Sequence, residues 1–194
     1  MAVERQTTRI LLVGTFLVFF VPIVAAWLLN IFAPGWRPFG TLNHGTLVAP
    51  VRRVSSTDLK HLDGSAMDPD YLSGRWTLVH LLDGGCGKPC VEALRRSYRV
   101  QLALGDDMQR VQLLLVLMES VDLESADLPP KVALAVANDA WLAAFSFAQT
   151  APRETLTTYL VDPQGYLMMR YAQDVDQRGM LADLERLLRI SKIG

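Results

Sequence analysis

The sequence is poor in the side chains that most often hold metals or attack substrates. It has only two cysteines and three histidines, and all three histidines precede both cysteines. It contains no HExxH motif, glycine-rich phosphate loop or nucleophile elbow, which excludes the best-known zinc-protease, nucleotide-hydrolase and serine-hydrolase sites. It also has no basic stripe, and its formal net charge of -1 argues against a nucleic-acid partner.

Charge is absent from one long segment near the N-terminus. No charged residue lies between Ile10 and Trp36, and the apolar run from Ile10 to Phe32 is long enough to cross a bilayer, which takes roughly 20 residues. The apolar core of a cleaved signal sequence is shorter, at about 7–15 residues. We therefore predict a single uncleaved transmembrane helix. The expected domains are a short head (1–9), a membrane anchor (10–33), a tether with an N-terminal extension (34–70) and a globular domain (71–194).

Positive charges do not orient this helix, because Arg5 and Arg9 precede it while Arg37, Arg52 and Arg53 follow it. The paired cysteines of the downstream domain fit an exported compartment, where disulfides form and persist. We expect a single-pass protein of the inner (plasma) membrane whose C-terminal domain faces the periplasm or an equivalent space.

The two cysteines, Cys86 and Cys90, stand in the sequence CGKPC between an apolar run and an amphipathic segment. Two thiols at this spacing can close a disulfide, exchange disulfides with a partner, or hold a soft metal ion such as Cu(I). A helix N-terminus together with Lys88 would favour the thiolate, with Cys86 attacking and Cys90 resolving the mixed disulfide. A purely structural disulfide is a further interpretation, although closing so short a loop stabilises a chain little.

The hydrophobic pattern after residue 70 predicts an α/β fold. Apolar runs with β-branched residues indicate buried strands, apolar residues at helical spacing indicate amphipathic helices, and DPQG at 162–165 indicates a hairpin turn. A helix between two apolar strands implies a parallel pair, so we expect a central mixed sheet flanked by helices. The predicted strands are 46–51, 76–82, 111–118, 157–161 and 165–171, and the predicted helices are 88–104, 131–147 and 175–190.

Three stretches carry a resemblance to a known family: GRWTLV at 74–79, the CxxxC motif that opens a helix, and YLVDPQG at 159–165. Together they resemble the thioredoxin-like superfamily. Within it, the cysteine spacing and the N-terminal anchor resemble the Sco/SenC proteins, the copper chaperones of cytochrome c oxidase assembly, whereas ordinary thioredoxins carry CxxC. The resemblance covers about residues 70–190. It implies a thioredoxin-like fold and a role in assembling the copper centre of the oxidase.

The chain departs from the Sco pattern at the third copper ligand. Sco proteins hold copper with both cysteines and a histidine shortly before the final hairpin, and here that position falls at or near Glu154, a hard ligand that suits copper poorly. The cysteine motif also continues with Val91, where Sco proteins usually have proline. Among the histidines, we expect His44 in a turn, His61 at the surface, and His80 in the core close to the cysteine turn.

The resemblance and the absent histidine together favour a thiol–disulfide redox protein that assists assembly of the oxidase copper centre, with Cys86 and Cys90 as the reactive pair and no required cofactor. Two alternatives stay open: a Cu(I) chaperone that uses the same cysteines, and a non-catalytic assembly scaffold with a structural disulfide. A peroxiredoxin-like peroxidase fits less well, because Gly84 and Gly85 stand where its threonine is expected. The expected partners are an oxidase subunit or another copper or thiol assembly factor, and the membrane.

Overall fold

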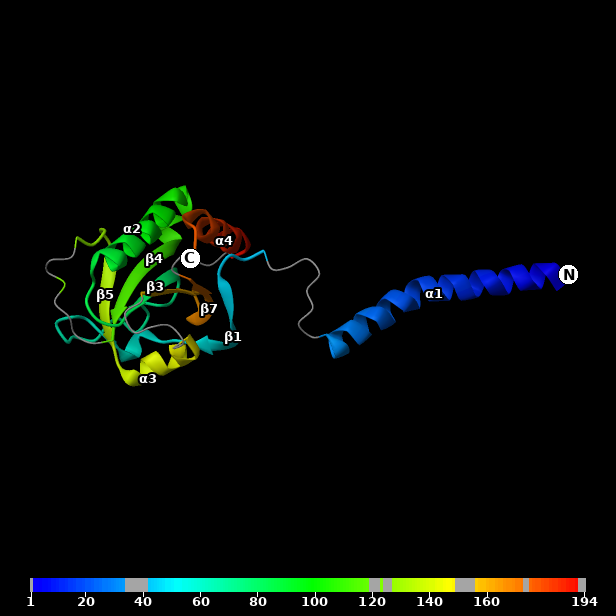
Figure 1. Cartoon of the computed structure of the whole chain (residues 1–194), viewed down its shortest axis with the longest axis horizontal. Coiled ribbons are helices and arrows are strands. Elements are labelled where there is room, and N and C mark those ends of the chain that lie inside the picture. Colours follow the sequence, from blue (N-terminus) through cyan, green and yellow to red (C-terminus); the bar gives the residue numbers. More distant parts are fainter. Residues whose placement is uncertain are drawn as a thin grey trace. The chain divides into compact units, whose positions relative to one another are not determined.

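The computed structural model describes residues 2–33, 42–118, 123, 127–148, 156–172 and 175–191. The chain divides into two compact units, Met1–Leu42 and Asn43–Gly194. The first unit contains helix α1 (Ala2–Phe32), and its segment Leu11–Phe32 is long and apolar enough to cross a membrane (Figure 1). Every side chain of that segment is exposed. A continuous apolar surface of this length is typical of a membrane span.

The second unit is built on a seven-stranded mixed sheet. Its strands are β1 (Thr46–Arg53), β2 (Leu59–Lys60), β3 (Trp76–Leu82), β4 (Val111–Leu117), β5 (Val132–Ala137), β6 (Thr157–Val161) and β7 (Tyr166–Tyr171). Across the sheet they follow the order β1-β7-β6-β3-β4-β5-β2. The neighbours β3, β4 and β5 run parallel, and the other neighbouring pairs are antiparallel. The mixed sheet predicted from the sequence is therefore confirmed.

Helices cover both faces of this sheet (Figure 1). They are α2 (Lys88–Ala103), α3 (Asp139–Leu142) and α4 (Gln177–Ile190), with 3-10 turns η1 (Ser56–Asp58), η2 (Gly105–Arg110) and η3 (Ala143–Ala148). α2 and α4 pack on the face that carries Leu78 and Leu113. α3 and η3 pack on the opposite face, which carries Val79 and Leu114. Alternate side chains of β3 and β4 thus pack into two hydrophobic cores, one on each side of the sheet.

Local sequence explains the central strands and the helix that follows them. β3 and β4 are buried at every position, as their unbroken apolar sequences predict for parallel strands covered on both faces. Pro89 stands in the first turn of α2, where its fixed φ favours a helix start. The helix then buries residues at spacings of three and four, namely Cys90, Leu94, Ser97 and Val100.

Most elements predicted from the sequence are present. The strand predicted over 76–82 has the same bounds in the structure, and the helices predicted over 88–104 and 175–190 differ by at most two residues at either end. The hairpin predicted around DPQG is formed by β6 and β7, in which the backbone N–H of Asp162 donates to the carbonyl of Tyr166 at 2.9 Å.

The helix predicted over 131–147 is wrong. Its first part is strand β5, and only Asp139–Leu142 is α-helical. Alanine favours helices by itself, but VALAVA alternates with the period of two that a strand uses. Pairing with β4 on one side and β2 on the other supplies backbone hydrogen bonds along both edges, so tertiary pairing overrides the local preference. Asn138 then starts α3, because its side chain accepts a hydrogen bond from the N–H of Trp141 at 2.8 Å.

Candidate functional site

The cysteine pair lies beyond the C-terminal end of β3, in the turn that leads into α2. Cys86 and Cys90 form a disulfide, and their Cα atoms are 5.2 Å apart. Gly84 adopts a positive φ of 96°, which lets the chain turn sharply after the strand. The backbone N–H of Cys90 donates to the carbonyl of Gly87 at 3.1 Å. The disulfide therefore joins the turn to the first turn of the helix.

The two sulfurs differ in their access to solvent. Cys90 is 3% exposed and belongs to an apolar cluster with Leu82, Leu94, Leu115, Leu117 and Leu156. Cys86 is half-buried and packs against the edge of that cluster. Cys86 is therefore the more accessible of the two cysteines.

The electrostatic setting of the pair favours negative charge. The first turn of α2 contains no acidic residue, and it does contain the exposed Lys88. The unpaired N–H groups at a helix N-terminus carry partial positive charge, and a nearby lysine adds to it. Both effects stabilise a thiolate more than a thiol when the disulfide is reduced.

His80 is fully buried in β3, as the sequence predicts, and its side chain lies on the same face as Leu82 by strand alternation. Its Nδ1 lies 3.0 Å from the hydroxyl oxygen of Thr158. Its Nε2 has no hydrogen-bond partner among the described residues. Burial lowers the pKa of His80 to about 3. The imidazole below the cysteine turn is therefore neutral at physiological pH.

His44 has a role that the sequence does not reveal. Its backbone N–H and that of Gly45 each donate to the carboxylate of Asp183 in α4 at 2.9 Å, and its ring Nδ1 lies 3.2 Å from the same carboxylate. The hydroxyl of Tyr171 donates to that carboxylate at 3.4 Å. Asp183 is 3% exposed, so a buried carboxylate joins the chain just before β1 to helix α4. We name these four residues the Asp183 cluster.

The Asp183 cluster could not be found from sequence because its members lie in three separated segments. A buried aspartate on the inner face of an amphipathic helix is the one local signal, since aspartate is rarely buried unless its oxygens are bonded. Burial, together with the charge and hydrogen bond of Asp183, raises the pKa of Tyr171. The tyrosine therefore remains a hydrogen-bond donor.

The described residues contain no group of three or more His, Cys, Asp or Glu side chains arranged to hold a metal ion. His61 is exposed, as predicted. The position that the Sco pattern assigns to the third copper ligand, at or near Glu154, lies outside the described residues. The donors that the described structure offers at this turn are thus the two sulfurs.

Residues 76–191 match the family described as "Transmembrane-like, thioredoxin-like, C-terminal domain". The chain belongs to this family. No curated protein matches the chain in sequence. The thioredoxin-like part of this family member begins at the first residue of β3 and ends just after α4.

Solved structures of Sco proteins share this fold. Apo Sco1 from Thermus thermophilus has a TM-score of 0.58 at 21% identity, over 78% of this chain and 100% of its own. Yeast Sco1 with copper bound has a TM-score of 0.57 at 12% identity, over 72% of this chain and 91% of its own. BsSco is described as a Sco-family cytochrome c oxidase assembly protein with a disulfide switch. It has a TM-score of 0.51 at 12% identity, over 72% of this chain and 98% of its own.

At these identities the likeness establishes a shared fold alone. It confirms the thioredoxin-like, Sco-type fold that the sequence predicts. It also covers 91–100% of each of these three Sco structures.

Proposed function

We propose that this chain is a membrane-anchored, Sco-like thiol–disulfide exchange protein that assists assembly of the copper centre of cytochrome c oxidase. The observation that carries the proposal is the unequal burial of the two joined cysteines, with Cys86 partly exposed and Cys90 buried, at a helix N-terminus of a Sco-type fold. A reachable attacking thiol and a protected resolving thiol are what exchange requires.

The exchange takes two steps. In the reduced protein the thiolate of Cys86 attacks one sulfur of a partner disulfide, and the other partner sulfur leaves as a thiolate. The thiolate of Cys90 then attacks Cys86 in the mixed disulfide, which releases the second partner thiolate and leaves the Cys86–Cys90 disulfide. The partner gains two electrons and this chain loses two. Each turnover therefore needs a dithiol reductant that returns Cys86 and Cys90 to thiols.

The proposed partner is an oxidase subunit whose copper-binding cysteines must be reduced before they can take up the metal, or another thiol assembly factor. Support comes from BsSco, which combines this fold with a disulfide switch and is described as an oxidase assembly protein. We further propose that α1 anchors the chain in the inner membrane and that the disulfide-bearing unit faces the periplasm, where disulfides persist.

A Cu(I) chaperone is the second candidate, with copper as the cargo. Two thiolates suit the soft Cu(I) ion once the disulfide is reduced. Yeast Sco1 has the same fold and is described with copper bound. The neutral imidazole of His80 is buried in β3, where its Nδ1 lies 3.0 Å from the hydroxyl of Thr158 and its Nε2 has no partner among the described residues. The exchange role needs no third donor, and for that reason we place it first.

The proposal is tested in cells that lack the chromosomal copy of this protein. The wild-type chain is expected to restore cytochrome c oxidase activity, and Cys86→Ser and Cys90→Ser are each expected to fail while still accumulating in the membrane. Activity restored by the double serine variant would contradict exchange and leave the scaffold interpretation. Lys60→Gln, a change of one exposed residue on β2, is the control that should restore activity.

Copper binding distinguishes the chaperone role from the thiol-reductant role. The reduced full chain in detergent is titrated with Cu(I) in competition with a chelator. Uptake of one equivalent, together with rescue of the serine variants by added copper in the growth medium, would favour the chaperone. No uptake excludes it and leaves the exchange role.

A further inference from the structure

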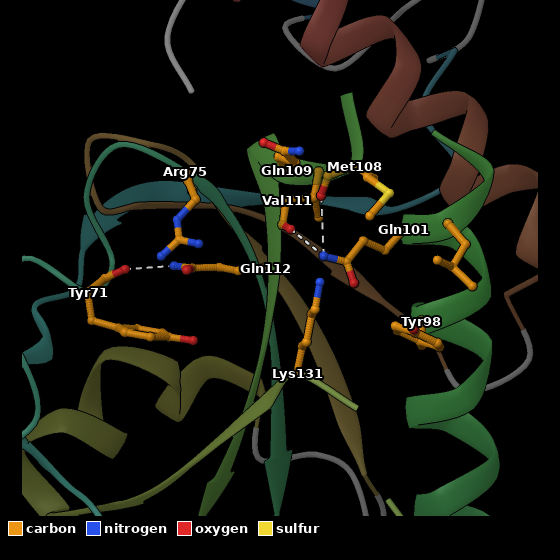
Figure 2. A pocket seen from close by; sticks show the side chains of 10 residues that line it. Tyr71, Arg75, Tyr98, Gln101, Met108, Gln109, Val111, Gln112 and Lys131 are labelled. Carbon is orange, nitrogen blue, oxygen red and sulfur yellow. Dashed lines mark hydrogen bonds between the residues drawn. The ribbon is translucent and has the colours of Figure 1, made fainter. Parts of the chain in front are cut away.

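A pocket of about 470 Å³ opens at the end of the sheet opposite the cysteines. It lies between the start of β4, the last turns of α2 and the turn before β5 (Figure 2). β3 has seven residues, so at about 3.3 Å per residue the pocket is on the order of 20 Å from the disulfide. Sites for small molecules have volumes of about 300–1,000 Å³. The pocket is thus large enough for a ligand and distinct from the cysteine site.

Two positively charged side chains enter this pocket from different elements. Arg75 reaches in from the loop before β3, and Lys131 reaches in from the turn before β5 (Figure 2). Neither has an acidic partner within ion-pair distance among the residues that the structure describes. Two unpaired cations at one pocket favour a negatively charged ligand.

The backbone conformation of Lys131 also indicates a binding site. Lys131 is the non-glycine residue with a positive φ, at 65°, among the described residues. Glycine or asparagine adopts that conformation at lower cost, and residues held in it tend to cluster at functional sites. The conformation of the turn therefore does not account for the choice of lysine at this position. A requirement for positive charge in the pocket does account for it.

Gln112 supplies a buried acceptor at the pocket. It is 5% exposed, and its Nε2 donates to the carbonyl of Tyr71 at 2.6 Å and to the hydroxyl of Thr77 at 2.9 Å. These two bonds fix the amide, and its Oε1 is left without a donor among the described residues. A buried acceptor without a donor destabilises the fold. A ligand hydroxyl would provide the missing donor.

Tyrosines complete the walls of the pocket. Tyr71 and Tyr98 are both half-buried and line it from opposite sides (Figure 2). Burial raises the pKa of Tyr71 against the opposing charge of Arg75, so its hydroxyl stays a neutral donor. Flat apolar rings next to charged and polar groups suit a small organic molecule better than a bare inorganic ion.

We propose that this pocket binds a small phosphate ester that carries a free hydroxyl group. Its phosphate is held between Arg75 and Lys131, and its hydroxyl donates to Oε1 of Gln112. Two cations match the charge of about -1.5 to -2 on a phosphate monoester at neutral pH. Free glycerol phosphate is such a monoester. The glycerol-phosphate headgroup of an anionic phospholipid shares the phosphate and the free hydroxyl, but its phosphate is a diester with one negative charge. The site is independent of the proposed exchange reaction.

The test uses the full chain in phosphatidylcholine nanodiscs and isothermal titration with sn-glycerol 3-phosphate. We expect saturable binding at one site, and about tenfold weaker binding in each of Arg75→Gln and Lys131→Gln. Arg178→Gln, which removes an exposed arginine of α4 outside the pocket, is the matched control and should bind as the wild type does. Neutral glycerol should not bind. Nanodiscs that contain phosphatidylglycerol distinguish the sources, because a headgroup ligand would compete with the free ester and weaken its apparent affinity.

The proposal is overturned by either of two results. One is the absence of saturable heat up to about 10 mM ester, which excludes a dissociation constant of about 1 mM or tighter. The other is binding that is unchanged in both pocket variants. Arg75 and Lys131 are exposed side chains, so their substitution is expected to leave folding intact, and thermal unfolding of each variant checks this.

Discussion

At the scale of single residues, His80 shows how the fold sets the chemistry of a side chain. Its imidazole is fully buried, and burial lowers its pKa to about 3. In the unfolded chain the same group has a pKa of about 6.5. The unfolded chain therefore takes up a proton as the pH falls below about 6.5, while the folded chain does not until about pH 3. Protonation of the unfolded state alone destabilises the fold across that window.

The free energy of unfolding is accordingly expected to fall by up to about 1.4 kcal/mol for each pH unit below about pH 6.5 because of His80. Urea unfolding of the full chain in detergent, measured between about pH 7 and pH 5, checks this slope. His80→Leu should remove most of it, and the exposed His61→Gln should retain it. A slope that survives unchanged in His80→Leu contradicts the assignment.

The difference between the two cysteines gives a second prediction at this scale. Cys90→Ser leaves the reachable Cys86 without its resolving partner, so this variant is expected to accumulate mixed disulfides with its partner in cells. Cys86→Ser should trap much less, because Cys90 is 3% exposed. Non-reducing electrophoresis of membranes, with mass spectrometry of the adducts, measures both. Equal trapping by the two variants would show that burial does not select the attacking thiol.

At the scale of the element, the parts predictable from sequence are those whose signals are local. The strand, the glycine turn and the helix around CGKPC each have a sequence signal that lies within a few residues. Their predicted bounds are nearly those observed. β5 is missed because its alanines favour a helix locally, and pairing with β4 and β2 overrides that preference. The Asp183 cluster is non-local as well, since it joins the chain before β1 to α4.

Asp183 should therefore contribute more to the free energy of unfolding than an exposed aspartate on the same amphipathic helix. Asp183→Asn replaces the charged acceptor of the His44 and Gly45 N–H groups by a neutral amide oxygen, which weakens both hydrogen bonds. The expected loss is about 1–3 kcal/mol in the free energy of unfolding. Asp176→Asn is the matched control, because this exposed aspartate precedes α4 and makes no side-chain cap hydrogen bond.

Hydrogen exchange separates the Asp183 cluster from a general loss of stability. Protection of the β1 amides should fall more in Asp183→Asn than protection of β3 and β4, because the cluster holds the segment that leads into β1. If Asp183→Asn unfolds at the same denaturant concentration as Asp176→Asn, the carboxylate does not fasten that segment.

At the scale of the whole molecule, the proposal requires a span and an exported domain in one chain. α1 contains a segment long and apolar enough to cross a membrane, and the unit 43–194 carries the disulfide. Composition is enough to predict the first of these. The orientation of the span in the membrane cannot be predicted from composition, because arginines lie on both sides of the apolar run. The side of the membrane has to be measured.

Cysteine labelling measures it directly. In intact spheroplasts treated first with a membrane-impermeant reductant to release mixed disulfides, a membrane-impermeant maleimide is expected to label Cys86 in the Cys90→Ser variant, because the proposal places the domain outside the membrane and Cys86 is the more exposed of the two cysteines. Cys86→Ser should label weakly for want of access to Cys90. Labelling of Cys86 that appears only after lysis places the domain in the cytoplasm, where a stable disulfide is not expected.

The central claim is that the Cys86–Cys90 disulfide is used for exchange, and its reduction potential tests that claim most directly. The full chain in detergent is equilibrated with dithiol buffers of defined potential, and the fraction of free thiol is measured by alkylation. The exchange role predicts a potential above about -300 mV, in the range of disulfides that thiol partners can reduce and reform. A potential below that value would mark an inert structural bond and contradict the account.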